Sequence, residues 1–214
     1  MGREFLDIFT DWSSDYDDFV EGNDPEYKAV FEGYSNILKE IVQRSGTSVL
    51  EFGIGTGNLT KQLLSSGKWV FPIEPSKEMR KLAKKKLPSE VIIYDGDLQN
   101  YPNPTKKLDT IVSSYVFHHL TDTEKGMALK KYADQLEKGG KVIFADTMFE
   151  SQEALNQKII QAREQQFYAL ADDLEREYYT LVPTLLTLFD LAGFNVSIEQ
   201  MNEYVWIIEG EKRA

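Results

Sequence analysis

The sequence predicts an α/β fold, a single domain over 1–214 in which a seven-stranded, mostly parallel sheet lies between two layers of helices. Three observations lead to this prediction. Short apolar segments alternate with longer segments of helical periodicity, as expected for parallel strands joined by crossover helices. A glycine-rich turn follows the first of the apolar segments. Two segments of alternating polarity close the chain in the manner of an antiparallel hairpin.

Composition and charge restrict the class of protein. The 42% hydrophobic and 28% charged residues are typical of a globular domain. Every apolar run is shorter than the ~18–20 residues that a membrane span needs, and the N-terminus lacks the apolar region of a signal peptide. The absence of cysteine excludes disulfides, thiolate metal sites and cysteine nucleophiles. We therefore expect a cytoplasmic protein without membrane contact.

The chain begins with a predicted helical flap over 1–44. In segment 3–20, apolar residues recur every three or four positions, which is the period of a helix with one buried face. Asp24 and Pro25 then supply an N-cap and a first-turn proline for a second helix. This second helix is expected to run to about Arg44.

The first strand runs directly into three glycines, Gly53, Gly55 and Gly57. Glycines at alternate positions let the backbone turn sharply and approach a ligand closely. The helix that follows points its N-terminal N–H groups at the same place, as in the nucleotide-binding corner of Rossmann-like folds. The dinucleotide fingerprint would need its third glycine at Asn58. The corner therefore predicts an adenosine-bearing cofactor and disfavours a dinucleotide.

Acidic side chains follow the next two strands. Glu74 ends the second strand about 20 residues after Gly53, where an acid can accept hydrogen bonds from a ribose diol. Asp97 follows the third strand in an Asp-Gly-Asp turn. No histidine or further carboxylate clusters in sequence with Asp95 and Asp97, so we expect no metal site. Pro72 lies inside the second strand and lacks an N–H, which predicts a bulge or a shifted register there.

The other elements follow from the same alternation. We predict strands at 48–52, 69–74, 91–94, 108–113, 141–146, 194–199 and 204–208, and helices at 58–66, 77–87, 122–137, 152–178 and 183–192. The helix over 77–87 carries a run of lysines on the face opposite its apolar residues, which is typical of a solvated helix. With a net charge of −11, the chain is not expected to bind nucleic acid.

Both histidines of the chain, His118 and His119, follow the strand at 108–113. Ligands of open parallel sheets bind outside the carboxyl ends of the strands, so this loop is expected to face the reacting groups. A histidine there can remove a proton near neutral pH. The alternative is that both rings only pack and hydrogen-bond within the loop.

The heptapeptide Glu51 to Gly57 reads E-x-G-x-G-x-G and resembles motif I of class I S-adenosylmethionine (SAM)-dependent methyltransferases. The acid at Asp97, the Gly139-Gly140 turn and the closing hairpin extend the resemblance over 49–210, and the whole chain resembles the YrrT-like bacterial family. Lys138 departs from the proline that usually precedes the Gly-Gly turn. The resemblance implies strand order 3-2-1-4-5-7-6, SAM as cofactor and S-adenosylhomocysteine as product.

The resemblance also implies which residues hold SAM. Those expected at the cofactor are Gly53, Gly55, Gly57, Glu74, Asp97, Leu98, Ser114 and Tyr16. Asp97 would accept the adenine amine, and Tyr16 belongs to a W-x-x-x-Y-D segment that lies against the cofactor in small-molecule methyltransferases.

His118 and His119 are the candidate catalytic residues for methyl transfer to an O, N or S atom of a small molecule. The flap over 1–44 and a helical insertion over 148–180 are expected to line the substrate side. The acidic net charge favours a neutral or cationic acceptor. Two alternatives stay open, a SAM-binding scaffold without turnover and an NAD-dependent oxidoreductase, and the sequence does not predict an oligomeric state.

Overall fold

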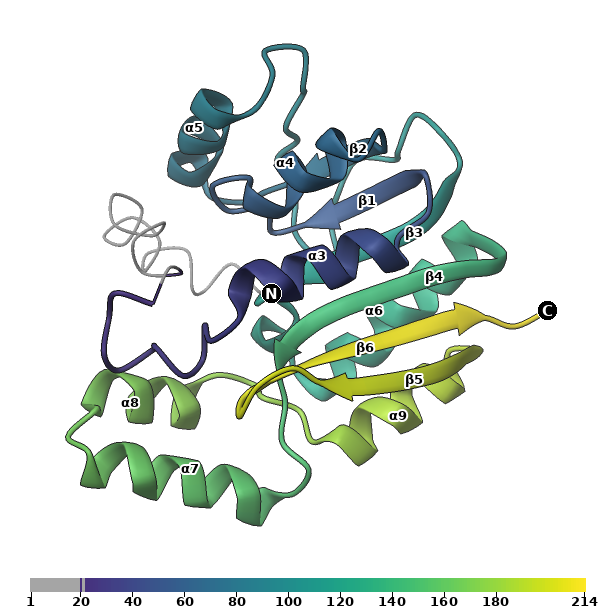
Figure 1. The fold of residues 1–214 in the computed structure, drawn as a ribbon. Helices are drawn as coiled ribbons and strands as arrows, with labels where there is room; N and C mark the ends of the chain where they lie inside the picture. Colours follow the sequence, from purple (N-terminus) through teal and green to yellow (C-terminus); the bar gives the residue numbers. More distant parts are fainter. Residues whose placement is uncertain (1–19, 21) are drawn as a thin grey trace.

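The computed structural model describes residue 20 and residues 22–214, and its centre is a sheet of six strands (Figure 1). The strands lie in the order β2-β1-β3-β4-β6-β5. The first four are parallel, and the hairpin of β5 and β6 pairs antiparallel with β4. Their bounds are β1 Ser48–Phe52, β2 Trp69–Ile73, β3 Leu108–Ser114, β4 Leu136–Thr147, β5 Phe194–Gln200 and β6 Val205–Lys212.

Helices cover both faces of the sheet, which confirms the predicted three-layer α/β fold with its C-terminal hairpin (Figure 1). The bounds are α3 Tyr34–Arg44, α4 Asn58–Ser65, α5 Lys77–Lys86, the 3-10 helix η1 Phe117–His119, α6 Asp122–Gln135, α7 Gln152–Glu164, α8 Tyr168–Arg176 and α9 Val182–Leu191. Alternate strand residues face opposite cores. Val49 packs in the core that α3 and α4 cover, whereas Leu50 packs in the core of α6 and α9.

Seven strands were predicted, and the one at 91–94 is reduced to a single bridge between Tyr94 and Ile73. Tyr94 N–H donates to the Pro72 carbonyl (3.0 Å), and Glu74 N–H donates to the Tyr94 carbonyl (3.0 Å). Extending this parallel ladder by one step would need an N–H from Pro72 to the carbonyl of Ile92, and proline has none. Pro72 therefore ends the ladder on this edge of the sheet.

The bulge predicted at Pro72 is wrong. The register between β1 and β2 is regular through the pair Glu51 and Pro72. The two backbone polar groups of a strand residue face the same neighbour, and the Pro72 carbonyl faces Tyr94. The missing N–H is thus on the side away from β1, where its absence costs no bond to that strand.

The helix predicted from Pro25 to Arg44 is shorter than expected. Residues 23–33 form turns, and α3 begins only at Tyr34. Gly33 at the N-cap has a φ of 72°, a left-handed conformation that interrupts helical hydrogen bonding and suits glycine. Asp24 does cap locally, because its Oδ1 accepts the Glu26 N–H at 2.8 Å. It caps a turn, however, and not the start of α3.

The helical stretch predicted over 152–178 is two helices. It breaks between α7 and α8 at Gln166, which has a φ of 62°. The Phe167 N–H folds back onto the Ala162 carbonyl at 2.8 Å and so closes α7. Among the described residues, no helix combines the length and apolarity needed to cross a membrane.

Candidate functional site

The glycine turn lies at the carboxyl end of β1, as predicted. Gly53, Gly55 and Gly57 have φ values of 62°, 55° and 88°, all in the left-handed region that L-residues avoid. A Cβ on Gly53 would come within 2.4 Å of Val116 Cγ2. Gly57 is the N-cap of α4, and no described side chain caps this helix. Within the turn, the Gly53 N–H donates to the Ile73 carbonyl and the Gly57 N–H to the Ile54 carbonyl, each at 2.8 Å, so the glycines set a tight backbone path and keep its outer surface clear of side chains.

Glu74 connects the glycine turn to the loop after β2. Its Oε2 accepts the Gly55 N–H at 2.9 Å, and its Oε1 accepts the Ser76 N–H at 2.8 Å. The carboxyl group is buried, and burial raises its pKa to about 7 against the opposing effect of these two hydrogen bonds. Because each carboxylate oxygen has two lone pairs, the group retains capacity for hydroxyl donors.

The two acids of the Asp-Gly-Asp turn have different environments. Asp97 is 9% exposed, and its Oδ1 accepts the N–H groups of Gln99 (2.9 Å) and Asn100 (2.8 Å). The Asp95 side chain is 56% exposed and lies 3.5 Å from Arg80. Leu98 is buried, and its carbonyl accepts the Tyr132 hydroxyl at 2.6 Å. The turn thus fixes Asp97 and Leu98 and leaves Asp95 in solvent.

Glu51, the first residue of the heptapeptide, is buried in β1. Its Oε2 has no hydrogen-bond partner among the described residues, and neither do Thr60 Oγ1 and Ser113 Oγ. Burial raises the pKa of Glu51 to about 8. The hydroxyl and backbone N–H of Thr60 act on this carboxyl group and lower its pKa, an effect that burial outweighs. Sequence reasoning used Glu51 only as part of a motif, although its position before the glycines was a usable signal.

His118 is held by the carboxylate of Asp146, near the end of β4. The Nδ1 of His118 lies 2.5 Å from Asp146 Oδ1, and its backbone N–H donates to Asp146 Oδ2 at 3.0 Å. Burial disfavours a charged ring, but the Asp146 carboxylate outweighs this effect and raises the pKa of His118. Asp146 was not predicted as a site residue, because 28 residues separate it from His118.

His119 has a different partner. Its Nδ1 lies 3.2 Å from Glu177 Oε2, and its ring centroid is 4.3 Å from that of His118. Burial, with a smaller contribution from charge on His118, lowers the pKa of His119. The structure therefore brings both predicted histidines together with two carboxylates from distant segments. Glu177 also escaped prediction, being 58 residues away in sequence.

The end of β3 carries a strained residue that the sequence did not indicate. Ser114 is the last residue of β3 and is partly buried. Tyr115 follows with a φ of 58°, unusual for a residue other than glycine. Its ring packs between Phe31 (4.9 Å between centroids) and Tyr34 (5.8 Å). Such strain is typical of functional sites. Tyr16, the remaining predicted cofactor residue, lies outside the described residues.

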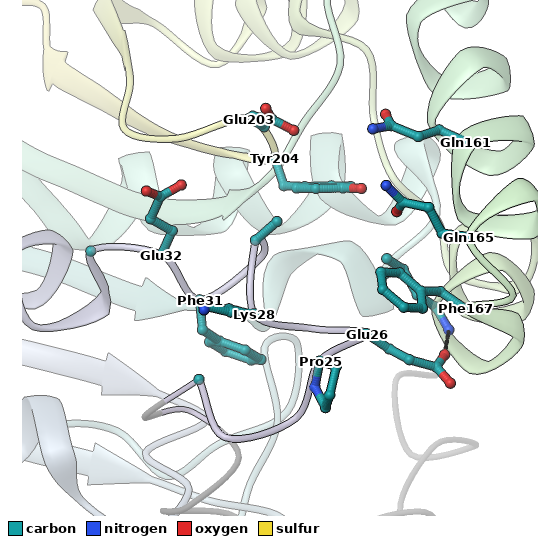
Figure 2. A pocket seen from close by; sticks show the side chains of 14 residues that line it. Pro25, Glu26, Lys28, Phe31, Glu32, Gln161, Gln165, Phe167, Glu203 and Tyr204 are labelled. Carbon is teal, nitrogen blue, oxygen red and sulfur yellow. Dashed lines mark hydrogen bonds between the residues drawn. The ribbon is translucent and has the colours of Figure 1, made fainter.

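A cavity of 530 Å³ opens beside the carboxyl ends of β3 and β4 (Figure 2). Its walls come from residues 22–33, from α7 and α8, and from Tyr204 just before β6. Phe31, Phe167 and Tyr204 supply aromatic surface, and the carboxylates are Glu26, Glu32 and Glu203. The Tyr204 carbonyl accepts the N–H of Met148, directly after β4 (3.0 Å), and Phe31 contacts Tyr115, directly after β3. The cavity thus lies off the carboxyl ends of these two strands.

Comparison with known proteins agrees with this geometry. A family model described as a methyltransferase domain matches residues 49–140. An uncharacterized methyltransferase of Oceanobacillus iheyensis is 55% identical over 214 residues, and the match covers 100% of both chains. A second such protein, from Geobacillus kaustophilus, is 53% identical over 214 residues with the same full coverage.

A solved structure of similar fold is magnesium protoporphyrin IX methyltransferase from Synechocystis PCC 6803 with bound SAM. It is 17% identical with a TM-score of 0.63, covering 87% of this chain and 83% of that chain. The complex of DhpI with S-adenosylhomocysteine (SAH) is also 17% identical, with a TM-score of 0.69 and coverage of 97% and 95%. At these identities the likeness concerns the fold.

Proposed function

The chain belongs to the class I SAM-dependent methyltransferases, and from this premise we propose that its methyl acceptor is a small molecule. The observation that carries the proposal is the 530 Å³ cavity off the carboxyl ends of β3 and β4 (Figure 2). Open parallel sheets bind ligands at this edge, and sites for small molecules measure about 300–1,000 Å³. The cavity and the glycine turn share the edge, since Val116 of the loop after β3 contacts Gly53.

The cofactor residues proposed from the sequence have an arrangement that suits SAM. We propose that Gly53, Gly55 and Gly57 leave room for the adenosine, that Glu74 accepts from the ribose hydroxyls, and that Asp97 with Leu98 meets the adenine. Ser114 and Tyr16 remain proposed cofactor contacts. When bound, SAM supplies a methyl group already activated by its sulfonium.

The charge of the cavity bears on the acceptor. Three carboxylates and one lysine, Lys28, line it together with three aromatic rings. Carboxylates and aromatic faces favour a neutral or cationic molecule over an anionic one. The lysines of α5, in contrast, belong to a helix whose buried residues are Met79 and Ala83. Lys86 at the end of this helix donates to Thr56 Oγ1 (2.9 Å) and Asn58 Oδ1 (3.2 Å) of the glycine turn, but no lysine of α5 lines the cavity. We therefore propose that nucleic acid is not the acceptor.

Removal of a proton from the acceptor is assigned to His118, with His119 as the neighbouring candidate. Asp146 binds His118 Nδ1 and its backbone N–H, which fixes the ring and directs Nε2 as the acceptor atom. Asp146 is then a positioning residue. A general base contributes about 10²–10⁴-fold to rate. His118→Gln should reduce kcat by that order, whereas SAM affinity should stay unchanged.

The decisive experiment is a screen for turnover. The protein is incubated with SAM and separate low-mass, RNA and protein fractions of a cell extract, and formation of SAH is followed. We expect SAH only with the low-mass fraction, and less of it from Asp97→Ala when SAM is below saturation. Turnover confined to RNA or protein would contradict the small-molecule proposal. SAM binding without turnover in any fraction would instead favour a non-catalytic scaffold.

A further inference from the structure

We propose that His118, His119 and Glu177 form a site for a divalent transition-metal ion, for which Zn²⁺ is the probe. Each residue offers one ligand atom, and these three atoms all lie within 4.8 Å of one another. The side chains are 12%, 12% and 6% exposed, so the group is held inside the protein and is not a chance cluster on its surface. The inference does not rest on methyl transfer.

The first ligand is already oriented by a second residue. Asp146 occupies Nδ1 of His118 at 2.5 Å and also accepts the backbone N–H of the same residue. The ring is therefore fixed with Nε2 as its remaining ligand atom. Histidines that bind metals are usually supported in this way by a carboxylate on the opposite nitrogen, which fixes the tautomer and raises ligand basicity.

The other two ligands come from segments that a direct contact holds together. The Tyr178 N–H donates to the His118 carbonyl at 3.1 Å, which ties the residue after Glu177 to the histidine loop. Glu177 Oε2 faces His119 Nδ1 at 3.2 Å, while Arg176 lies 3.6 Å from the other carboxylate oxygen. A dication between His119 and Glu177 would replace the hydrogen bond that now joins them. Metal binding to histidine releases protons in this way.

The donor set selects the class of ion. Two imidazole nitrogens and one carboxylate are the ligands of catalytic zinc sites and of non-haem iron sites, whereas Mg²⁺ and Ca²⁺ prefer oxygen ligands. Metal–ligand bonds of about 2.0–2.2 Å place neighbouring ligand atoms about 3–3.5 Å apart. Side-chain movements of about an ångström would bring the present group to that spacing.

Charges near the group are compatible with a dication. Asp146 and Glu177 supply two carboxylates. The buried amine of Lys125, which acts on His118, donates to the carbonyls of Leu120 (2.5 Å) and Tyr178 (2.6 Å). The ion would take Nε2 of His118, the atom to which we assign proton removal, so Zn²⁺ would act as an inhibitor of that step.

The test measures metal binding to the full chain without SAM. Protein freed of metal by a chelator is titrated calorimetrically with ZnCl₂, and then with MgCl₂. We expect one equivalent of Zn²⁺ to bind and Mg²⁺ to show no binding. Glu177→Gln, which keeps the shape of the side chain, should weaken Zn²⁺ binding by at least ~100-fold, and Asp146→Asn by about 10–100-fold.

The matched control is Glu175→Gln, two residues before Glu177, in the last turn of α8. Glu175 is exposed and pairs with Arg163 at 2.9 Å, outside the proposed site, so this variant should bind Zn²⁺ like the wild type. Circular dichroism verifies that each variant is folded, and SAM titration of the same samples reports separately on the cofactor corner. Absence of stoichiometric Zn²⁺ binding, or equal affinity in the Glu175 and Glu177 variants, would overturn the proposal.

Discussion

At the scale of single residues, the acidic side chains around the glycine turn differ in exposure. Asp97 is buried and fixed by two backbone N–H groups, whereas Asp95, two positions earlier, is in solvent. Glu74 is buried and bonded to the glycine turn. Only a carboxylate with its orientation already set can recognise one face of a nucleoside at low entropic cost. This difference gives a direct comparison between neighbouring residues.

Asp97→Ala should weaken SAM binding by about 1–3 kcal/mol, because a buried donor of the adenine would lose its acceptor. Isothermal titration calorimetry measures the effect. Asp95→Ala is the matched control and should bind like the wild type. Asp97→Asn keeps an oxygen for the Gln99 and Asn100 N–H groups and so separates loop distortion from loss of the acceptor. Equal affinity for wild type and Asp97→Ala would remove Asp97 from the site.

Glu51 makes folding stability depend on pH. Burial raises its pKa from 4.5 to about 8, so the folded chain retains a proton that the unfolded chain loses between those values. Its contribution to stability is complete below about pH 4.5 and is lost as the pH rises through about 8. Glu51→Gln cannot ionise and escapes this loss.

The stability of Glu51→Gln relative to the wild type should therefore increase by on the order of 1–3 kcal/mol between about pH 5 and pH 8. Urea unfolding without ligand at the two pH values measures this difference. Glu74 titrates in both proteins, and its charge is a smaller cause of the raised pKa of Glu51, so the comparison measures the Glu51 carboxyl together with this coupling. A stability difference that is the same at both pH values would show that Glu51 is ionised in the folded chain.

At the scale of elements, most of the helices and strands were predictable, because their periodicity and caps are local. Ser76 caps α5 and Thr121 caps α6, the latter in a capping box with Glu124. The predictions were wrong where contacts outside the segment, rather than its own sequence, determine the structure. The segment at 91–94 has strand composition, but pairing depended on Pro72 of the adjacent strand. Gln166, an ordinary helix former, gave no local signal for the break between α7 and α8.

The turn between β1 and α4 can be tested against the glycine that follows α4. Gly53 and Gly67 both have positive φ, but a Cβ on Gly53 would meet Val116 at 2.4 Å, whereas a Cβ on Gly67 would meet nothing within 4 Å. Gly67→Ala should lower the free energy of unfolding by about 1–2 kcal/mol, because alanine is strained in the left-handed backbone conformation. Gly53→Ala should lower the free energy of unfolding by a further ~1–3 kcal/mol, because the added methyl group would collide with Val116. Chemical denaturation measures both, and equal costs would contradict the close approach of Val116.

For the whole molecule, the position that we propose for the site follows from the topology of the sheet. The carboxyl ends of parallel strands lie on the same side of the sheet, and the glycines, Glu74 and the histidine loop all follow such ends, whereas Asp97 follows the single bridge at Tyr94. The partners of the histidines were not predictable. Asp146 and Glu177 reach them only through the packing of β4 and α8, and a single sequence carries no signal for contacts over such separations.

The central claim is that the glycine turn, Glu74 and Asp97 together bind the adenosine half of SAM. A crystal structure with SAH tests it most directly. We expect adenosine density over Gly53 to Gly57, ribose hydroxyls within hydrogen-bond distance of Glu74, and the adenine amine at Asp97. Density for SAH elsewhere, with this corner filled by the protein's own side chains, would contradict it.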